Sequence, residues 1–351
     1  SLGDWYVNSE KFPTGLKGII DKCKSAGLKF GLWLEPEMVS EDSDLYRSRP
    51  DFAIAKRGVE PCRSRNQLVL DLTKSEVVDY LFGVISRLLT RNDISYIKWD
   101  KNRDMTEFYS DGLPFDRQGE FQHRYTLGFY DLADRLTRAF PNVLIEGCAG
   151  GGGRFDGGAL YYFPQIWTSD DSDAVERLYI QHGTSMLYPT SAMGAHVSAS
   201  PNHQVYRTTS IDIRGHVAMC GQFGYELDLN KISDEEFEAV KEQIKFYKTI
   251  SHITHKGTMY RLLSPFEGNY AVWEFLSENE DEIVLMIASV IRRGGWLAQT
   301  RILLKGLDED ASYRVENTGE IYGGDFLMNV GFKRSPDSDF ESELLVIRKV
   351  K

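Results

Sequence analysis

Short apolar runs alternate with amphipathic stretches over about the first 250 residues of this chain. Residues 16–26 carry apolar side chains at helical spacing, and residues 28–35, which follow Gly27, have the character of a strand. Strands that alternate with helices in this way are typical of βα units around a parallel sheet. The other predicted helices are 75–89, capped by Ser75, 122–140, and 234–250, capped by Ser233; the other predicted strands are 67–72, 94–100, 142–147, 165–169, 183–188 and 215–221.

These seven strand candidates fall one short of a closed (β/α)8 barrel, which needs eight. Because the chain opens abruptly with Ser1-Leu-Gly-Asp-Trp5, without an initiator Met or a signal peptide, we expect the first strand to precede Ser1. An open doubly wound sheet is the alternative, although such sheets usually carry a nucleotide-binding glycine turn. The expected fold is therefore an α/β (β/α)8 TIM-type barrel that occupies residues 1–256 and lacks its first strand.

From Gly257 onward the pattern changes to short strands only. Turn-forming residues separate them, among them Gly268 and the pair Gly294-Gly295. This pattern predicts a C-terminal all-β domain, an antiparallel sandwich over residues 257–351. Its predicted strands are 257–263, 269–275, 282–289, 301–304, 312–315 and 344–350.

Charge and composition exclude several classes of partner. The net charge of −11 disfavours nucleic acid and anionic membranes, because both select for basic patches. No apolar run approaches the roughly 20 residues that a bilayer span needs. The four cysteines (Cys23, Cys62, Cys148 and Cys220) are scattered without a CxxC or Cys/His cluster, which indicates neither a zinc site nor a disulfide framework. A reducing compartment, the cytoplasm, fits this usage best.

Polar residues stand where the predicted barrel strands end, which is the active face of such a barrel. In the first such segment, alternation along the strand puts Trp33, Glu35 and Glu37 on one face. Trp33 is placed to form a flat wall against a sugar ring. A core tryptophan with two structural carboxylates explains the same pattern equally well.

The second segment, Tyr96 to Arg103, places Lys98, Asp100 and Asn102 on one side of the next strand. A carboxylate between a cation and an amide stays ionised, as a nucleophile requires. The alternative is a structural Lys–Asp ion pair at the strand end.

The third segment contains four consecutive glycines, Gly150 to Gly153, between Cys148 and Arg154. Glycines let the backbone approach a ligand closely and present its N–H groups. Neither phosphate-binding glycine pattern, GxxxxGK[ST] or GxGxxG, is matched cleanly, so a nucleotide site is disfavoured. A purely conformational turn remains the alternative.

The fourth segment, Trp167 to Asp173, holds the carboxylates Asp170, Asp171 and Asp173 within four residues. Such crowding favours at least one carboxyl that keeps its proton, which suits a general acid. The segment lacks the ligand spacing and the closing glutamate of an EF-hand calcium loop. An acidic helix N-terminus is the remaining alternative. Two acidic strand ends in one barrel mouth give the paired carboxylates of glycoside hydrolysis.

These strand ends closely resemble those of glycoside hydrolase family 36, the melibiase-type α-galactosidases. The segments that carry the resemblance occur in family order across the predicted barrel. They are Leu2-Gly-Asp-Trp5, Gly31-Leu-Trp-Leu-Glu-Pro-Glu-Met38, Cys62-Arg-Ser-Arg65, Tyr96-Ile-Lys-Trp-Asp-Lys-Asn-Arg103, Cys148-Ala-Gly-Gly-Gly-Gly-Arg-Phe-Asp156 and Trp167-Thr-Ser-Asp-Asp-Ser-Asp173.

The resemblance implies a retaining α-galactosidase that acts on melibiose and raffinose-type oligosaccharides. Asp100 then corresponds to the nucleophile and Asp170 to the general acid/base, with Asp171 and Asp173 as the other candidates for the acid. No metal or organic cofactor is implied, and the family suggests a homo-oligomer, a tetramer. The residues that correspond to substrate-binding positions are Trp33, Arg65, Lys98, Asn102, Cys148, Gly151 and Trp167.

Two other functions fit the same residues. A transferase of the same architecture would move galactosyl groups onto another sugar with the same carboxylates. A catalytically impaired galactose-binding fragment is also compatible, because the resemblance begins at the second barrel strand and lacks the family's N-terminal β-sandwich.

Overall fold

The computed structural model of the chain describes residues 1–56, 58–292, 301–334, 336 and 338–350. The described chain forms two compact units, residues 1–167 and 168–351, which are treated separately below. The predicted turn at Gly294-Gly295 lies outside the described residues.

The N-terminal unit is built on four parallel strands in the order β1-β4-β5-β6. These strands are β1 (Gly31–Leu34), β4 (Tyr96–Trp99), β5 (Leu144–Gly147) and β6 (Gln165–Trp167). In register, Lys98 of β4 lies between Trp33 of β1 and Glu146 of β5. Since parallel strands point the same way, the polar residues at their carboxyl ends gather at one edge of the sheet.

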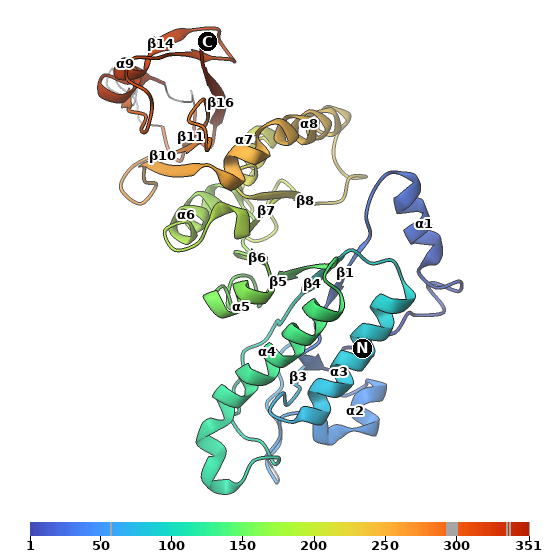
Figure 1. Ribbon diagram of the computed structural model, residues 1–351. Helices are drawn as coiled ribbons and strands as arrows, with labels where there is room; N and C mark the ends of the chain where they lie inside the picture. The colour runs from blue at the N-terminus through green and yellow to red at the C-terminus, as the bar shows by residue number, and fades with distance from the viewer. Residues whose placement is uncertain (57, 293–300, 335, 337, 351) are drawn as a thin grey trace. The chain divides into compact units, whose positions relative to one another are not determined.

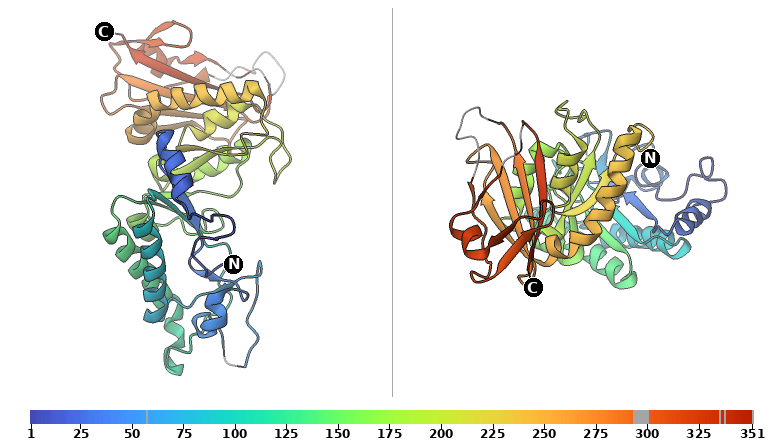
Figure 2. Two further views of the ribbon diagram at one scale, coloured as in Figure 1. Left: turned by 90° about the vertical axis from the view of Figure 1, so that its right-hand side faces the viewer. Right: turned by 90° about the horizontal axis from the view of Figure 1, so that it is seen from above.

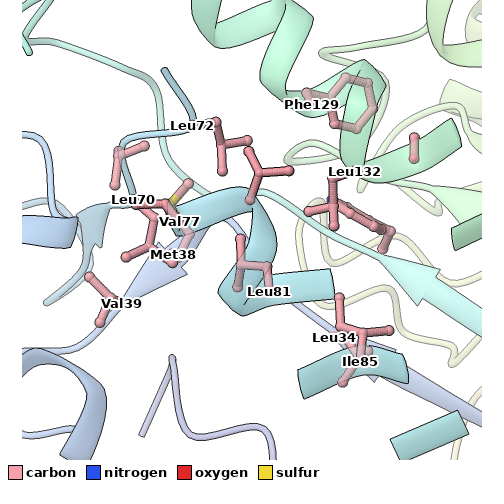
Figure 3. Close-up of a cluster of buried hydrophobic side chains, with 14 of the residues drawn as sticks. Leu34, Met38, Val39, Leu70, Leu72, Val77, Leu81, Ile85, Phe129 and Leu132 are labelled. Atoms are coloured by element: carbon pink, nitrogen blue, oxygen red, sulfur yellow. The ribbon is translucent and has the colours of Figure 1, made fainter. Parts of the chain in front are cut away.

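The long helices α3 (Ser75–Arg91) and α4 (Phe121–Ala139) run side by side and cover the strands (Figure 1). Their apolar faces join the strands and the intervening loops in one buried cluster, which includes Leu34, Leu81 and Phe129 (Figure 3). The shorter helical segments of this unit are α1 (Lys17–Ser25), α2 (Asp44–Ser48), η1 (Pro50–Phe52), η2 (Phe115–Glu120) and α5 (Gly157–Tyr162).

The prediction that residues 67–72 form a strand of the parallel sheet is wrong. Only β3 (Leu68–Val69) is extended and paired, and it runs antiparallel to β2 (Met38–Val39). Leu70 and Leu72 are instead buried in the cluster under α3. The apolar run therefore reflects burial of a loop. The helix that follows begins one residue earlier than predicted, since Lys74 occupies the N-cap position and Ser75 is the first helical residue.

The C-terminal unit begins with α6 (Ala174–Thr184), η3 (Thr190–Ala192), β7 (Met193–Ser198), α7 (Ile211–Ala218), β8 (Gln222–Glu226) and α8 (Asp234–Lys256). β7 and β8 pair in parallel. The strands predicted at 183–188 and 215–221 are wrong: the first spans the end of α6 and a turn, and the second lies largely in α7. The predicted cap of α8 is confirmed, because the Ser233 hydroxyl accepts the N–H of Glu236 at 3.2 Å.

The rest of this unit is an antiparallel sheet of six strands in the order β14-β13-β16-β11-β10-β9. Helix α8 packs against one face of the sheet (Figure 2), and β12, β15 and α9 supply apolar side chains to the other face. The prediction of an antiparallel C-terminal β-region is therefore correct. In the described residues, the layer that packs on the six-stranded sheet includes the two-stranded ladder of β12 and β15. The elements are β9 (Thr258–Leu263), β10 (Tyr270–Leu276), β11 (Glu282–Ser289), β12 (Arg301–Ile302), β13 (Ser312–Val315), β14 (Ile321–Gly323), α9 (Gly324–Asn329), β15 (Phe332–Lys333) and β16 (Ser342–Lys349).

Across the described ranges, no helix has both the length and the apolar character that crossing a membrane would require.

Candidate active site

Asp100 directly follows β4, and its buried carboxylate is surrounded by donors. The indole Nε1 of Trp33 donates to Oδ2 at 3.0 Å, and the side-chain amide of Asn102 donates to the same oxygen. The backbone N–H of Lys101 donates to Oδ1 at 2.8 Å, and the thiol of Cys148 is also hydrogen-bonded to the carboxylate. The site therefore brings together four side chains that come from three different strand ends.

This environment determines the charge of Asp100. Burial alone would favour the neutral acid, but the hydrogen bonds from Cys148, Asn102 and Trp33 outweigh it and lower the pKa of the carboxyl. The thiol responds in the opposite direction, because burial and then the neighbouring Asp100 charge raise the pKa of Cys148. Asp100 is thus an ionised carboxylate beside a neutral thiol.

A cavity of about 860 Å³ within the N-terminal unit is bordered by two hydrogen-bond partners of this carboxylate, Trp33 and Asn102. Trp33, Glu35, Arg65 and Asn102 line it, together with Trp5. Trp33 is 44% exposed and is therefore not a core tryptophan. Its ring is supported edge-on by Trp5, with the centroids 6.3 Å apart.

Arg65 is another of the residues that line this cavity. It is exposed, its backbone is left-handed (φ 55°), and its Nη1 donates to the backbone carbonyl of Asn102 at 3.3 Å. This contact ties the exposed guanidinium to the Asn102 backbone at the edge of the cavity.

Glu35 is a buried carboxyl beside Asp100. From the sequence alone, its segment could either face a ligand or hold structural carboxylates. It accepts the backbone N–H of Asn102, and Gln67 Nε2 lies 3.3 Å from its other oxygen. Burial raises the pKa of Glu35, and the charge of Asp100 raises it further, while the Asn102 N–H opposes the shift. The pKa values of the two neighbouring carboxyls are therefore shifted in opposite directions, that of Glu35 upward and that of Asp100 downward.

The hydrogen bonds that lower the pKa of Asp100 most come from Cys148, Asn102 and Trp33. The ammonium of Lys98 instead lies 3.2 Å from the buried carboxylate of Glu146 and 4.5 Å from the centre of the Trp167 ring. Trp167 itself is almost fully buried at the end of β6. Lys98 thus forms an ion pair with Glu146 of the neighbouring strand and a ring contact with Trp167.

The glycine-rich segment follows β5 and folds as a tight turn. Gly150 and Gly151 have positive φ of 55° and 83°, and the N–H of Ala149 donates to the carbonyl of Gly151 at 2.8 Å. A side chain at Gly153 would meet the carbonyl oxygen of Ala149 at 2.6 Å, so glycine is required there. The turn presents Cys148 toward Asp100.

Arg154 anchors the end of this turn. Its terminal nitrogens lie 2.7 and 3.1 Å from the two carboxylate oxygens of Glu37, which also accepts from Trp99 at 2.9 Å and from Tyr125 at 2.9 Å. Glu37 is fully buried, and these charged and polar partners lower its pKa against the effect of burial, with Arg154 the largest of them. Glu37 is therefore a structural carboxylate, as the second interpretation of that segment held.

The acidic cluster belongs to the C-terminal unit. Asp173 is buried and caps α6 by accepting the N–H groups of Val175 and Glu176, both at 3.0 Å, and it also pairs with Arg207. The helix N-terminus interpretation is therefore correct for Asp173. Asp171 accepts the N–H of Asp173 at 3.1 Å. Asp170 is exposed and lies before the capping residues.

Comparison with known protein families gives two matches that together cover most of the chain. The melibiase family model matches residues 1–257, and the C-terminal domain model of glycosyl hydrolase family 36 matches residues 270–347.

Curated relatives carry the same assignment. The chain is 51% identical over 331 residues to α-galactosidase AgaA of Geobacillus stearothermophilus, covering 94% of this chain and 45% of the relative. It is 49% identical over 332 residues to α-galactosidase Mel36A of Lactobacillus acidophilus, covering 95% of this chain and 45% of the relative. The chain thus spans less than half the length of these relatives.

Solved structures agree closely with the described fold. A variant of AgaA from G. stearothermophilus in complex with raffinose matches with a TM-score of 0.97 at 49% identity, over 100% of this chain and 49% of that one. The α-galactosidase of Lactobacillus brevis matches with a TM-score of 0.97 at 45% identity, over 100% of this chain and 48% of that one. On the family match over residues 1–257 and these identities, the chain belongs to the melibiase family, glycosyl hydrolase family 36.

Proposed function

We propose that this chain carries the catalytic centre of a retaining α-galactosidase that hydrolyses terminal α-galactosides such as melibiose and raffinose-type oligosaccharides. The observation that carries the proposal is the ionised carboxylate of Asp100, held by Trp33, Asn102 and Cys148 beside a cavity with an exposed tryptophan face. Relatives named α-galactosidases, with structures of AgaA variants in complex with raffinose and stachyose, support the substrate class.

The chemistry is a double displacement at the anomeric carbon. The Asp100 carboxylate attacks this carbon, while Asp170 gives its proton to the departing glycosidic oxygen. Asp170 then takes a proton from water, and the resulting hydroxide displaces Asp100 and releases galactose with its α configuration retained. Trp33 walls the sugar, and the sugar hydroxyls meet Arg65, Lys98, Asn102, Cys148 and Gly151. Trp167 contributes to the subsite through its ring contact with Lys98.

The proposal extends to the architecture. The parallel strands belong to a (β/α)8 barrel over residues 1–256, and residues 257–351 form a separate C-terminal β-domain. This division is supported by the change from α8 to β9 at Lys256 and Thr258. The assembled enzyme is a homo-oligomer, a tetramer by its family, and works in the cytoplasm.

The test uses the complete protein and p-nitrophenyl α-galactoside. Asp100→Ala should lower kcat by at least about 10⁴-fold, and added azide should restore turnover by entering the space of the lost carboxylate and forming β-galactosyl azide. The matched control is Asp104→Ala, which removes an exposed carboxylate from the same loop and should retain wild-type activity. Full activity in Asp100→Ala, or an azide product of the α configuration, would refute the assignment.

A further inference from the structure

We propose that Glu146 is a positioning residue that holds the ammonium of Lys98 in place for the substrate. This inference rests on the proposed function for its substrate, but its structural content concerns only β4, β5 and β6 of the N-terminal unit. No role has been assigned to Glu146 above. It is a fully buried carboxylate on β5, directly beside Lys98 of β4.

The position of Glu146 is set by strand register. Lys98 and Glu146 are direct partners in the parallel pairing of β4 with β5, so both side chains leave the sheet on the same face. Oε1 of Glu146 lies 3.2 Å from Nζ of Lys98. The side chain of Glu146 is 0% exposed and that of Lys98 is 19% exposed, so the pair is screened little by solvent.

The other oxygen of Glu146 is fixed from both neighbouring strands. Tyr96 of β4 donates its hydroxyl to Oε2 at 2.6 Å, and Nε2 of Gln165 in β6 donates to the same oxygen. Two donors on Oε2 prevent rotation of the carboxylate and leave Oε1 directed at Lys98. Burying a carboxylate is costly unless it is paired in this way, which indicates a defined role for the charge.

The Lys98 contact is held by charge rather than by a directed hydrogen bond. Oε1 of Glu146 lies close to Nζ but has no hydrogen-bond partner of good geometry in the described residues. On its other side the ammonium lies 4.5 Å from the centre of the Trp167 ring, within the range of a cation–π contact. The carboxylate and the indole thus fix the position of Nζ from two sides, and the proposed substrate meets the ammonium that they hold there.

An amide cannot take over this arrangement. A glutamine at position 146 has one oxygen and one NH₂ group, whereas the site presents two donors on one side and an ammonium on the other. With its NH₂ toward Lys98 the amide sets donor against donor; with its NH₂ toward Gln165 it offers the ammonium only a neutral oxygen and requires Gln165 and Tyr96 to reverse their hydrogen bonds. Glu146→Gln therefore removes the charge and misplaces Lys98 at nearly constant volume.

The experiment compares Glu146→Gln with Tyr96→Phe in the complete protein. We expect Glu146→Gln to lower kcat/KM for p-nitrophenyl α-galactoside by about 10- to 100-fold, with most of the loss in KM. Without the carboxylate the ammonium loses its proton more readily, so the alkaline limb of kcat/KM should move to lower pH. Cys148 also interacts electrostatically with Lys98, and its thiol is unchanged in both variants.

Tyr96→Phe is the matched control, because it removes one hydrogen bond from the same buried carboxylate but keeps its charge. It should cost less than about threefold in kcat/KM and leave the alkaline limb in place. Equal losses in the two variants, or an unmoved alkaline limb in Glu146→Gln, would overturn the proposal and assign Glu146 a purely structural role.

A second measurement does not depend on hydrolysis. Acetylation by trace acetic anhydride, followed by peptide mass spectrometry across pH, reports when each lysine loses its proton. With the exposed Lys22 as the internal standard, Glu146→Gln should shift the acetylation profile of Lys98 to lower pH relative to the wild type. Identical Lys98 profiles in the two proteins would contradict the proposal. A shifted profile in a protein without α-galactosidase activity would instead uphold the positioning role and refute the proposed function.

Discussion

The indole nitrogen of Trp33 donates a hydrogen bond to the carboxylate of Asp100 across 3.0 Å, from β1 to the residue that ends β4. The same ring is 44% exposed at the cavity and is braced by Trp5. One side chain thus forms a wall of the cavity and fixes the orientation and charge of the carboxylate. Substitution at Trp33 should therefore change the ionisation of the nucleophile as well as sugar binding.

Trp33→Phe should lower kcat/KM by about 10- to 100-fold, since a hydrogen bond to a charged group contributes about 1.5–3 kcal/mol. The lost donor is one of those that lower the pKa of Asp100, so this pKa should rise. Because the nucleophile acts as the carboxylate, the acid limb of the kcat/KM profile should move to higher pH. Trp5→Phe, which alters the brace but no donor to Asp100, should leave the acid limb in place; movement in both variants would contradict the account.

Glu37→Gln should destabilise the fold by about 3 kcal/mol, because it leaves the Arg154 guanidinium without its buried counter-charge. The measurement is the shift of the urea unfolding midpoint. Glu41→Gln is the control: its pairing with Arg63 is 40% exposed on both sides and should contribute less than about 1 kcal/mol.

The same carboxylate predicts a pH dependence. The pKa of Glu37 is lowered in the fold, so its stabilisation is present above the ordinary value of 4.5 and is lost as the pH falls below it. Wild-type stability should therefore decrease below pH 4.5 more steeply than that of Glu37→Gln. Parallel pH profiles would show that Glu37 is not the ionised partner of Arg154.

Glu274 of β10 should make the C-terminal unit less stable at alkaline pH. It is fully buried between Val272 and Leu276 on the strand, one oxygen accepts the N–H of Lys305 at 2.9 Å, and Oε1 has no hydrogen-bond partner in the described structure. Burial raises its pKa from 4.5 to about 8. Its contribution is thus complete below pH 4.5 and is lost as the pH rises through about 8, by up to about 4 kcal/mol.

Glu274→Gln removes this titration and resembles the protonated acid in shape. The thermal midpoint of the wild type should fall relative to that of Glu274→Gln between pH 6 and pH 9, whereas Glu309→Gln, at an exposed position, should follow the wild type. A constant difference between wild type and Glu274→Gln over this range would mean that Glu274 does not ionise there.

The proposed acid/base is tested by the leaving group of the substrate. Asp170→Asn should lower kcat/KM for raffinose by at least about 10³-fold, but much less for an aryl galactoside whose leaving group needs no proton. Asp173→Asn should act differently: it removes the buried charge that pairs with Arg207 at the start of α6 and should lower the unfolding midpoint. A leaving-group dependence in Asp171→Asn but not in Asp170→Asn would transfer the role to Asp171.

Periodicity predicted helices α1, α3, α4 and α8 and the four parallel strands of the N-terminal unit, and it failed where apolar runs were buried on every side. The segment 215–221 lies mostly in α7, whose residues Ile213, Val217 and Ala218 are all buried, so its sequence lacks the polar face that marks a helix. β7 and β8 were missed for the opposite reason. They contain glycines and polar residues, among them Gly194, His196 and Gly224, which have little intrinsic strand preference.

The sequence predicted those contacts of the site that form between residues of a single strand end. Asp100 and Asn102 are two residues apart, and their contact follows from alternation along the strand. Contacts that depend on the tertiary fold were not predicted. Glu37 and Arg154 are 117 positions apart, and Lys98 pairs with Glu146 because of the register of β4 with β5. A glutamate inside the otherwise apolar Leu144-Ile145 strand was the available clue to that pair.

Covalent trapping of the nucleophile tests the central claim most directly. The complete protein would be incubated with 5-fluoro-α-galactosyl fluoride, whose glycosyl-enzyme forms quickly and hydrolyses slowly, and the labelled residue would be located by peptide mass spectrometry. The account predicts one fluorogalactosyl group per chain, attached to Asp100. A label on Glu35 or on the Asp170–Asp173 cluster, or steady turnover by Asp100→Ala, would contradict it.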